Sequence, residues 1–180
     1  VIGTNHLDSS ARYGHLNFVH AMNRALGIHR MMNTSEEINK AKAFLIIGAN
    51  ITETNPVASL RVKSAISLYK AQTIVVDSVQ TNIAKLGSHP IMVNPGTEGL
   101  YIQALVKSVI HQDLIDEEAT NAHPDALTAL KQATESYTLE DVSQQTGVDV
   151  EQIHETARIF AEAPRSIIIC GEGILRQANG

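Results

Sequence analysis

The sequence predicts an α/β fold, doubly wound around a mainly parallel sheet, and three features of the 180 residues carry this prediction. Short aliphatic runs without polar alternation, such as Phe44–Ile47, are typical of strands covered on both faces. A turn with glycine or an acidic residue follows each run, as at Gly48 and Asp77. Helical patterns with one apolar face, such as that beginning at Pro56, separate the runs. This alternation is that of successive βαβ units.

The elements can be placed along the chain from these patterns. Strands are expected at Phe44–Ile47, Thr73–Val76, His89–Val93 and Ser166–Cys170. Helices are expected to begin near Ala11, at Pro56, after Thr97, at Pro124, after Thr138 and after Asp149. Proline fits the first turn of a helix because no N–H donor is needed there. Thr138 with Asp141, and Asp149 with Gln152, have the spacing of capping boxes.

Composition limits the function classes. The net charge of −5 disfavours a general nucleic-acid-binding surface. No apolar run is long enough to insert in a membrane, and we expect a cytoplasmic protein. The single cysteine, Cys170, excludes an internal disulfide or a cysteine-ligated iron–sulfur cluster held by this segment alone. The chain lacks an initiator methionine and both ends lie in glycine-containing sequence, so we expect a piece of a longer protein.

The carboxyl ends of the strands are the expected ligand-binding edge, as in other parallel α/β sheets. The first turn, Gly48–Glu53, has neither the GxGxxG nor the P-loop pattern, which disfavours ordinary NAD or nucleoside triphosphate binding. Asp77 could accept hydrogen bonds from a ribose or a base, or it could cap the turn near Val79. Glu98 has the same two interpretations, since an acid is favoured in any first helical turn.

Two further patterns carry less information. The eight histidines show no HExxH spacing, and Cys170 is expected to be an inert buried thiol. Leu139–Arg158 imitates a helix-turn-helix, but its second helix carries three acidic residues against Arg158 alone. Repulsion from phosphate disfavours DNA binding by such a helix. We interpret this stretch as a helical hairpin.

Taken in order, several segments resemble formate-dehydrogenase-type molybdopterin oxidoreductases. They are Gly3–Arg12, Glu37–Asn55, Ile74–Thr81, Asn94–Glu98, Thr138–Ala161 and Cys170–Gly173 with Ala178-Asn179-Gly180. The resemblance implies a Rossmann-like domain at residues 41–180 and, at residues 1–40, the end of an adjoining domain. It also implies a molybdopterin guanine dinucleotide cofactor, with iron–sulfur clusters only in upstream parts of the full chain. Other domains of the same chain and other subunits of a redox complex are the implied partners.

The resemblance assigns roles to residues of this chain. Cofactor-binding positions are expected at Gly48, Asn50, Thr52, Glu53, Asp77, Thr81, Gly96, Thr97, Glu98, Gly171 and Gly173. His15 is the catalytic candidate if the protein is active. Gly14 occupies the position of the family's cysteine or selenocysteine metal ligand, so no metal ligand is expected from it.

Three departures from the family pattern favour a specific subgroup. Besides Gly14, the arginine expected after the second strand is absent from Asp77–Thr81, and Asn94 replaces another arginine. Charge-assisted hydrogen bonds to phosphate are strong, so both losses matter. The pattern resembles the large iron–sulfur subunit of NADH–quinone oxidoreductase, respiratory complex I, which implies electron transfer without molybdenum chemistry in this domain. The alternative is the dinucleotide-binding segment of an active formate dehydrogenase alpha subunit.

Overall fold

A computed structural model describes residues 3–8, 14–28, 33–116, 118 and 124–175. Its centre is a sheet of four parallel strands in the order β3-β2-β1-β4. The strands are β1 (Ala43–Ile47), β2 (Gln72–Asp77), β3 (His89–Met92) and β4 (Ser166–Cys170). In the register, Leu45 lies opposite Ile74 on one side and Ile168 on the other. The parallel α/β sheet confirms the predicted fold class.

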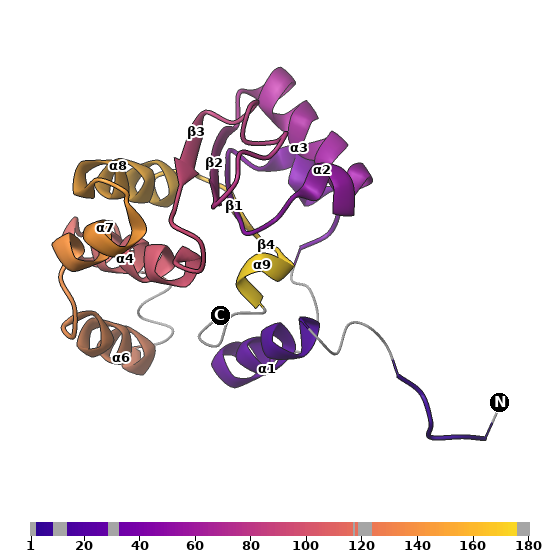
Figure 1. The fold of residues 1–180 in the computed structure, drawn as a ribbon, viewed down its shortest axis with the longest axis horizontal. Coiled ribbons are helices and arrows are strands. Elements are labelled where there is room, and N and C mark those ends of the chain that lie inside the picture. The colour runs from indigo at the N-terminus through magenta and orange to yellow at the C-terminus, as the bar shows by residue number, and fades with distance from the viewer. Residues whose placement is uncertain (1–2, 9–13, 29–32, 117, 119–123, 176–180) are drawn as a thin grey trace.

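Helices cover both faces of the sheet (Figure 1). On one face, Phe44 and Ile46 pack with α2 (Ile51–Thr54) and α3 (Pro56–Tyr69) in one buried cluster. On the other, Leu45 and Ile47 belong to a second cluster with α4 (Glu98–His111) and α8 (Val150–Ala161). All five side chains of β1 are buried, which explains the absence of polar alternation in its sequence.

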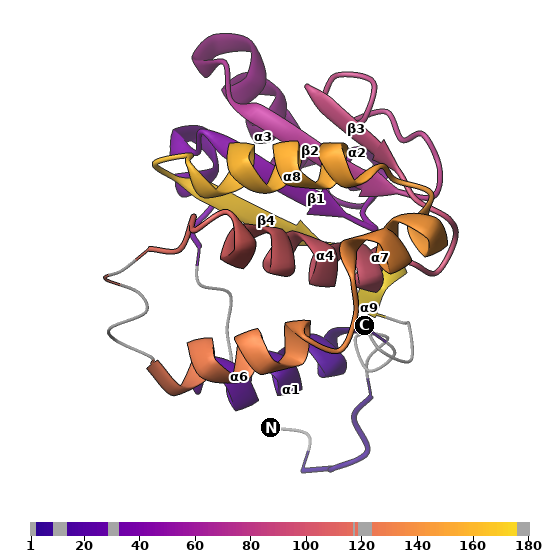
Figure 2. The same ribbon diagram turned by 90° about the vertical axis from the view of Figure 1, so that its left-hand side faces the viewer.

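Helices α4 and α8 lie side by side on the same face of the sheet (Figure 2). Buried polar contacts as well as apolar ones hold this face together. The Tyr101 hydroxyl of α4 lies 2.7 Å from the Thr156 hydroxyl of α8. The Lys107 ammonium donates to the main-chain carbonyl oxygens of Thr134 and Tyr137. These carbonyls lie at the end of α6 (Pro124–Thr134) and just before α7 (Leu139–Thr146), so Lys107 fixes that connection on α4.

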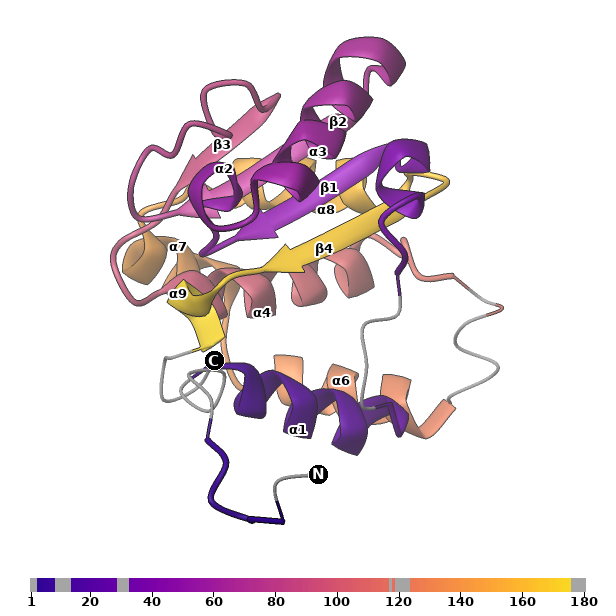
Figure 3. The same cartoon turned by 90° about the vertical axis from the view of Figure 1, so that its right-hand side faces the viewer.

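The described residues before β1 form two helical elements that lie at different places around the sheet. The short 3₁₀ helix η2 (Glu37–Lys40) packs beside α3, and Ile38 contacts the α3-side cluster. Helix α1 (His15–Leu26) lies beyond the carboxyl ends of β1 and β4, next to the short helix α9 (Glu172–Leu175) (Figure 3). The Asn17 amide nitrogen donates to the Leu175 carbonyl oxygen at 3.0 Å. The carboxyl edge of the sheet is therefore bordered by α1.

The predicted element boundaries agree closely with the structure, including the start of α3 at Pro56. The capping box at Thr138 is confirmed, since Thr138 and Asp141 exchange both hydrogen bonds. The box at Asp149 is wrong: Asp149 and Gln152 are exposed, where water competes for both side chains, and Asp149 makes no side-chain cap. Thr97 precedes α4 but donates to Asn94 O instead of capping the helix. Helix α1 begins at His15, and the predicted start near Ala11 lies outside the described residues.

Two other expectations concern the helices. Leu139–Arg158 forms a hairpin in which Gly147, with φ of 78°, ends α7 before α8 begins. Among the described residues, none of the helices combines the length and the apolar character that crossing a bilayer requires.

Candidate functional site

The strand order creates a topological switch point between β1 and β4. From β1 the chain proceeds outward through β2 to β3, and it then returns past the sheet to place β4 on the other side of β1. At such a point the connections leave in opposite directions, and a crevice opens beyond the carboxyl ends of the two strands. The loops that follow Ile47 and Cys170 lie at this point in the present chain, and α9 and α1 lie beyond them (Figure 3).

The loops after β1 and β4 meet backbone to backbone. Gly171 N–H donates to Ile47 O at 2.9 Å and Gly173 N–H donates to Gly48 O at 3.2 Å. A Cβ at Gly48 would lie 2.9 Å from Ile174 N, and one at Gly171 would overlap the Gly48 carbonyl oxygen. Gly48 also has φ of 55°. The three glycines are therefore required by the contact between the loops themselves, apart from any ligand.

Asn50, Thr52 and Glu53 surround the start of α2. The Thr52 hydroxyl donates to the Asn50 side-chain oxygen at 2.7 Å, and Glu53 N–H donates to the Asn50 main-chain oxygen at 3.0 Å. The Glu53 side chain is exposed, whereas Asn50 and Thr52 are half-buried. Asn50 thus organises this loop and presents its side chain at the carboxyl edge of β1.

Asp77 and Thr81 each close a local turn after β2. Asp77 Oδ1 accepts the Val79 N–H at 3.1 Å, and Thr81 Oγ1 accepts the Ala84 N–H at 3.3 Å. The capping interpretation of Asp77 is therefore confirmed. The Asp77 carboxylate, which accepts through one oxygen in this turn, is half-buried at the end of β2.

The loop after β3 is attached to α7. Asn94 donates through its side-chain amide to Gln145 O at 2.8 Å, and its main-chain N–H donates to Thr146 O at 2.9 Å. Gly96 has φ of 81° and no atom within 4 Å of an ideal Cβ placed on it, so backbone conformation alone favours glycine there. Glu98 is 5% exposed in the first turn of α4. Asn94 therefore has a structural function in this chain.

Residues from the amino-terminal segment reach the same edge. Gly14 is buried at the start of α1, and a Cβ placed on it would lie 3.8 Å from Glu172 Cγ. His15 is the first residue of α1 and is exposed. The fold thus brings Gly14 and His15 beside the loop that follows β4. Sequence reasoning did not select Asn17 and Glu172, which join α1 to α9; the Gly171-Glu172-Gly173 turn was the only indication of their position.

The four strand-end loops at this edge are acidic. Their stretches 48–55, 77–81, 94–98 and 171–173 contain Glu53, Asp77, Glu98 and Glu172, and none contains lysine or arginine. Carboxylates accept hydrogen bonds from N–H and O–H groups, as a base edge and a ribose offer, but they repel phosphate. In the part of the chain that the structure describes, no three histidine, cysteine or acidic side chains gather as a metal site. Burial raises the pKa of the Cys170 thiol and keeps it protonated.

Comparison with known proteins gives a consistent family. The molybdopterin oxidoreductase family model matches residues 1–180. The F420-dependent formate dehydrogenase subunit alpha of Methanocaldococcus jannaschii is 34% identical over 177 residues, covering 98% of this chain and 26% of that protein. Formate dehydrogenase H of Escherichia coli is 27% identical over 180 residues, covering 100% and 25% respectively. The chain therefore spans about a quarter of the length of these curated relatives.

A solved structure supports the same fold. Acetylene hydratase from Pelobacter acetylenicus superposes with a TM-score of 0.67 at 20% identity, covering 89% of this chain and 24% of that one. At this identity the likeness concerns the fold alone. The relatives named above do not support the complex I identification; they favour the formate dehydrogenase alternative. From the match over its whole length, the chain belongs to the molybdopterin oxidoreductase family.

Proposed function

We propose that this chain is the dinucleotide-binding segment of a formate-dehydrogenase-type alpha subunit. The observation that carries the proposal is the 34% identity to such a subunit over 98% of the chain. The geometry supports it, because the loops with the assigned positions Gly48–Glu53, Asp77–Thr81, Gly96–Glu98 and Gly171–Gly173 follow four parallel strands at one edge.

The residues at this edge fit the guanosine half of a molybdopterin guanine dinucleotide. Asp77, half-buried at the end of β2, would accept hydrogen bonds from the guanine N–H groups or the ribose hydroxyls, and the Asn50 side chain lies at the adjoining loop. Since the four loops lack lysine and arginine, the phosphates would be held by backbone N–H groups of this segment or by other parts of the full protein. When bound, the cofactor supplies redox chemistry at its metal.

The chain's own residues define what this segment contributes. Gly14 has no side chain to ligate a metal, so any protein ligand to the metal comes from elsewhere. His15, exposed at the start of α1 beside α9, would be placed to handle a proton near the cofactor. The segment would thus bind and orient the dinucleotide, within a cytoplasmic complex whose iron–sulfur clusters and partner subunits lie outside it.

The test uses the purified full-length protein. Oxidative release is expected to yield the fluorescent pterin derivative together with guanosine monophosphate. Asp77→Ala should lower the amount of both, because it removes an acceptor at the guanosine end. Glu135→Ala, which removes an exposed carboxylate after α6, is the control and should leave both unchanged. Equal pterin content in the two variants would refute the role of Asp77.

Gly14 is the observation that favours a second candidate. A complex I-type subunit would keep this fold for electron transfer without molybdenum, as the missing ligand and the two missing arginines led us to expect. Elemental analysis separates the candidates: molybdenum or tungsten in the full-length protein would eliminate the second. If metal, pterin and guanosine monophosphate are all absent, the formate dehydrogenase proposal fails.

A further inference from the structure

A basic hollow lies at the amino ends of β1 and β4, opposite the candidate cofactor edge. Its volume is about 560 Å³. The charged and aromatic residues that line it are Lys40, Lys42, Arg61, Arg165, Glu36 and Tyr69. Four cations therefore face one carboxylate, in a chain whose net charge is −5. We call this surface the basic hollow.

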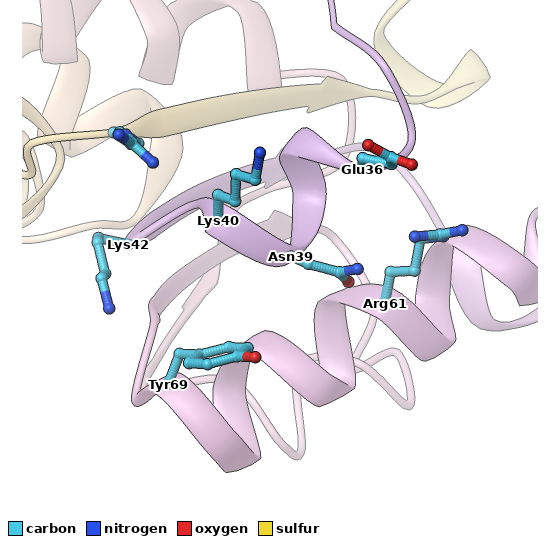
Figure 4. A pocket seen from close by; sticks show the side chains of 7 residues that line it. Glu36, Asn39, Lys40, Lys42, Arg61 and Tyr69 are labelled. Atoms are coloured by element: carbon cyan, nitrogen blue, oxygen red, sulfur yellow. The ribbon is translucent and has the colours of Figure 1, made fainter.

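The fold brings these residues together from four elements. Lys42 and Arg165 immediately precede β1 and β4, and Lys42 N–H donates to Arg165 O at 2.7 Å. Lys40 ends η2 and Arg61 lies on α3. The Lys42 ammonium lies 5.7 Å from the centre of the Tyr69 ring. Figure 4 shows Arg61 reaching from α3 towards Glu36, and Lys42 and Tyr69 near each other at the other end of the hollow.

An apolar stripe on α3 continues the basic hollow. Val57, Leu60 and Leu68 are 68%, 63% and 71% exposed, and Tyr69 is 53% exposed. They line, with Asn39, Arg61 and Ser64, a second hollow of about 380 Å³. It shares Asn39, Arg61 and Tyr69 with the first. The opposite face of α3 is already buried against the sheet through Val62 and Ala65. An exposed apolar stripe next to concentrated charge is typical of an interaction surface.

We propose that the basic hollow and the α3 stripe together dock an acidic amphipathic segment of a separate protein subunit. The cations would pair with its carboxylates, and Leu60 and Leu68 would contact its apolar side chains. Lys40, Lys42 and Arg165 are all exposed, so their field extends into solvent. Such a field accelerates the encounter of separate molecules, which a covalently tethered domain does not require. The cationic lining thus specifies an acidic occupant, and the steering of an encounter between separate molecules favours another polypeptide.

The proposed docking surface goes beyond the proposed function and does not depend on bound cofactor. The basic hollow is formed at the amino ends of the strands, whereas the cofactor positions follow their carboxyl ends. The two edges also carry opposite charge, because the loops at the carboxyl edge contain four carboxylates and no cation. A failure to find pterin would therefore not count against the docking surface. A failure of the docking test would likewise not count against the cofactor edge.

The test is photo-crosslinking of the full-length protein in the cells that make it. The photoreactive amino acid p-benzoylphenylalanine replaces Leu68 in the stripe or, as the matched control, Leu130, which is 47% exposed on α6. Mass spectrometry then identifies the crosslinked peptide. The expected product at position 68 is a peptide of another polypeptide in which acidic and aliphatic residues alternate at helical spacing.

Charge dependence distinguishes docking from chance contact. Lys40→Glu with Arg61→Glu should lower the yield at position 68 about threefold or more, since several ion pairs are reversed together. Lys85→Glu with Lys131→Glu, the control of equal charge change, should not. When the crosslinking is repeated in a lysate of the same cells, raising the salt concentration should lower the yield without any substitution in the cationic residues. Any of four results would overturn the proposal: a crosslinked product within the same polypeptide, a product with lipid, a yield no higher than at position 130, or a yield insensitive to charge and salt.

Discussion

Replacing Gly171 by alanine tests the contact between the loops that follow β1 and β4. An added Cβ would overlap the Gly48 carbonyl oxygen and would lie 2.5 Å from Ala49 Cα and 2.6 Å from Ala49 Cβ. Two of these three atoms belong to the main chain and cannot rotate away. The loops must therefore separate, and this weakens the hydrogen bonds that Gly171 N–H and Gly173 N–H donate across the contact in the parent protein.

The magnitude follows from the atoms involved. Overpacking of a rigid site typically costs about 1–3 kcal/mol, and loss of one buried hydrogen bond adds about 1 kcal/mol. We therefore expect Gly171→Ala to lower the free energy of unfolding by about 3 kcal/mol. With a urea slope of about 2 kcal/mol per molar, the midpoint should fall by about 1.5 M. Urea unfolding of the purified protein, followed by far-ultraviolet circular dichroism, measures this change.

Gly96→Ala is the control for this measurement. Gly96 has φ of 81° and no atom within 4 Å of its ideal Cβ, so alanine brings backbone strain without steric overlap. Such strain costs about 1 kcal/mol. If Gly171→Ala destabilises the protein no more than Gly96→Ala does, the steric account of the glycine contact is refuted.

Three further substitutions test the α4 side of the fold. Lys107→Met keeps the apolar stem but removes two hydrogen bonds to buried carbonyls, and it should cost about 2 kcal/mol or more in urea unfolding; an unchanged midpoint would contradict this. Thr138→Ala should cost about 1 kcal/mol. The hydrogen bond from Thr138 lowers the pKa of Asp141. The stability from the cap should therefore be present above the pKa of the carboxylate in the unfolded chain and should disappear as pH falls through its pKa in the folded protein. A pH-independent difference in the free energy of unfolding between Thr138→Ala and the parent would contradict this. Burial raises the pKa of Tyr101. The stability that its neutral side chain contributes should therefore be fully present below the pKa that tyrosine has in the unfolded chain, and it should be lost as pH rises through the pKa in the folded protein. The Tyr101→Phe variant should show the same rise in absorbance near 295 nm as the parent over the pH range in which the other tyrosines ionise. A smaller rise in the variant over that range would show that Tyr101 ionises with them and is accessible to solvent.

Much of the fold was predictable because local signals coincide with tertiary burial. Pro56 marks the start of α3, and the uninterrupted apolar run of β1 reflects burial on both faces. The strand order was not predictable, since β4 is separated from β1 by more than a hundred residues and no local signal states on which side it pairs. The failed capping box at Asp149 shows the same limit at small scale. Spacing permits a side-chain hydrogen bond, but water competes for exposed groups.

The candidate site was predictable in position and less so in role. The carboxyl-edge rule places Gly48, Asp77 and Gly171 together, as the parallel sheet confirms. Gly48 and Gly171 were expected as cofactor-binding positions, and the structure shows that the contact between two loops requires glycine at both. The approach of Gly14 to Glu172 depends on how α1 packs beside α9, which pairwise spacing along the sequence cannot reveal.

The central claim is that the carboxyl edge of this sheet holds the guanosine end of a molybdopterin dinucleotide. The most direct measurement is the amount of guanosine monophosphate released per chain when the purified full-length protein is hydrolysed. The account predicts stoichiometric release from the parent protein and from Glu135→Ala, with a clear reduction in Asp77→Ala. The absence of guanosine monophosphate from the parent protein, or release of a pterin without it, would contradict the account.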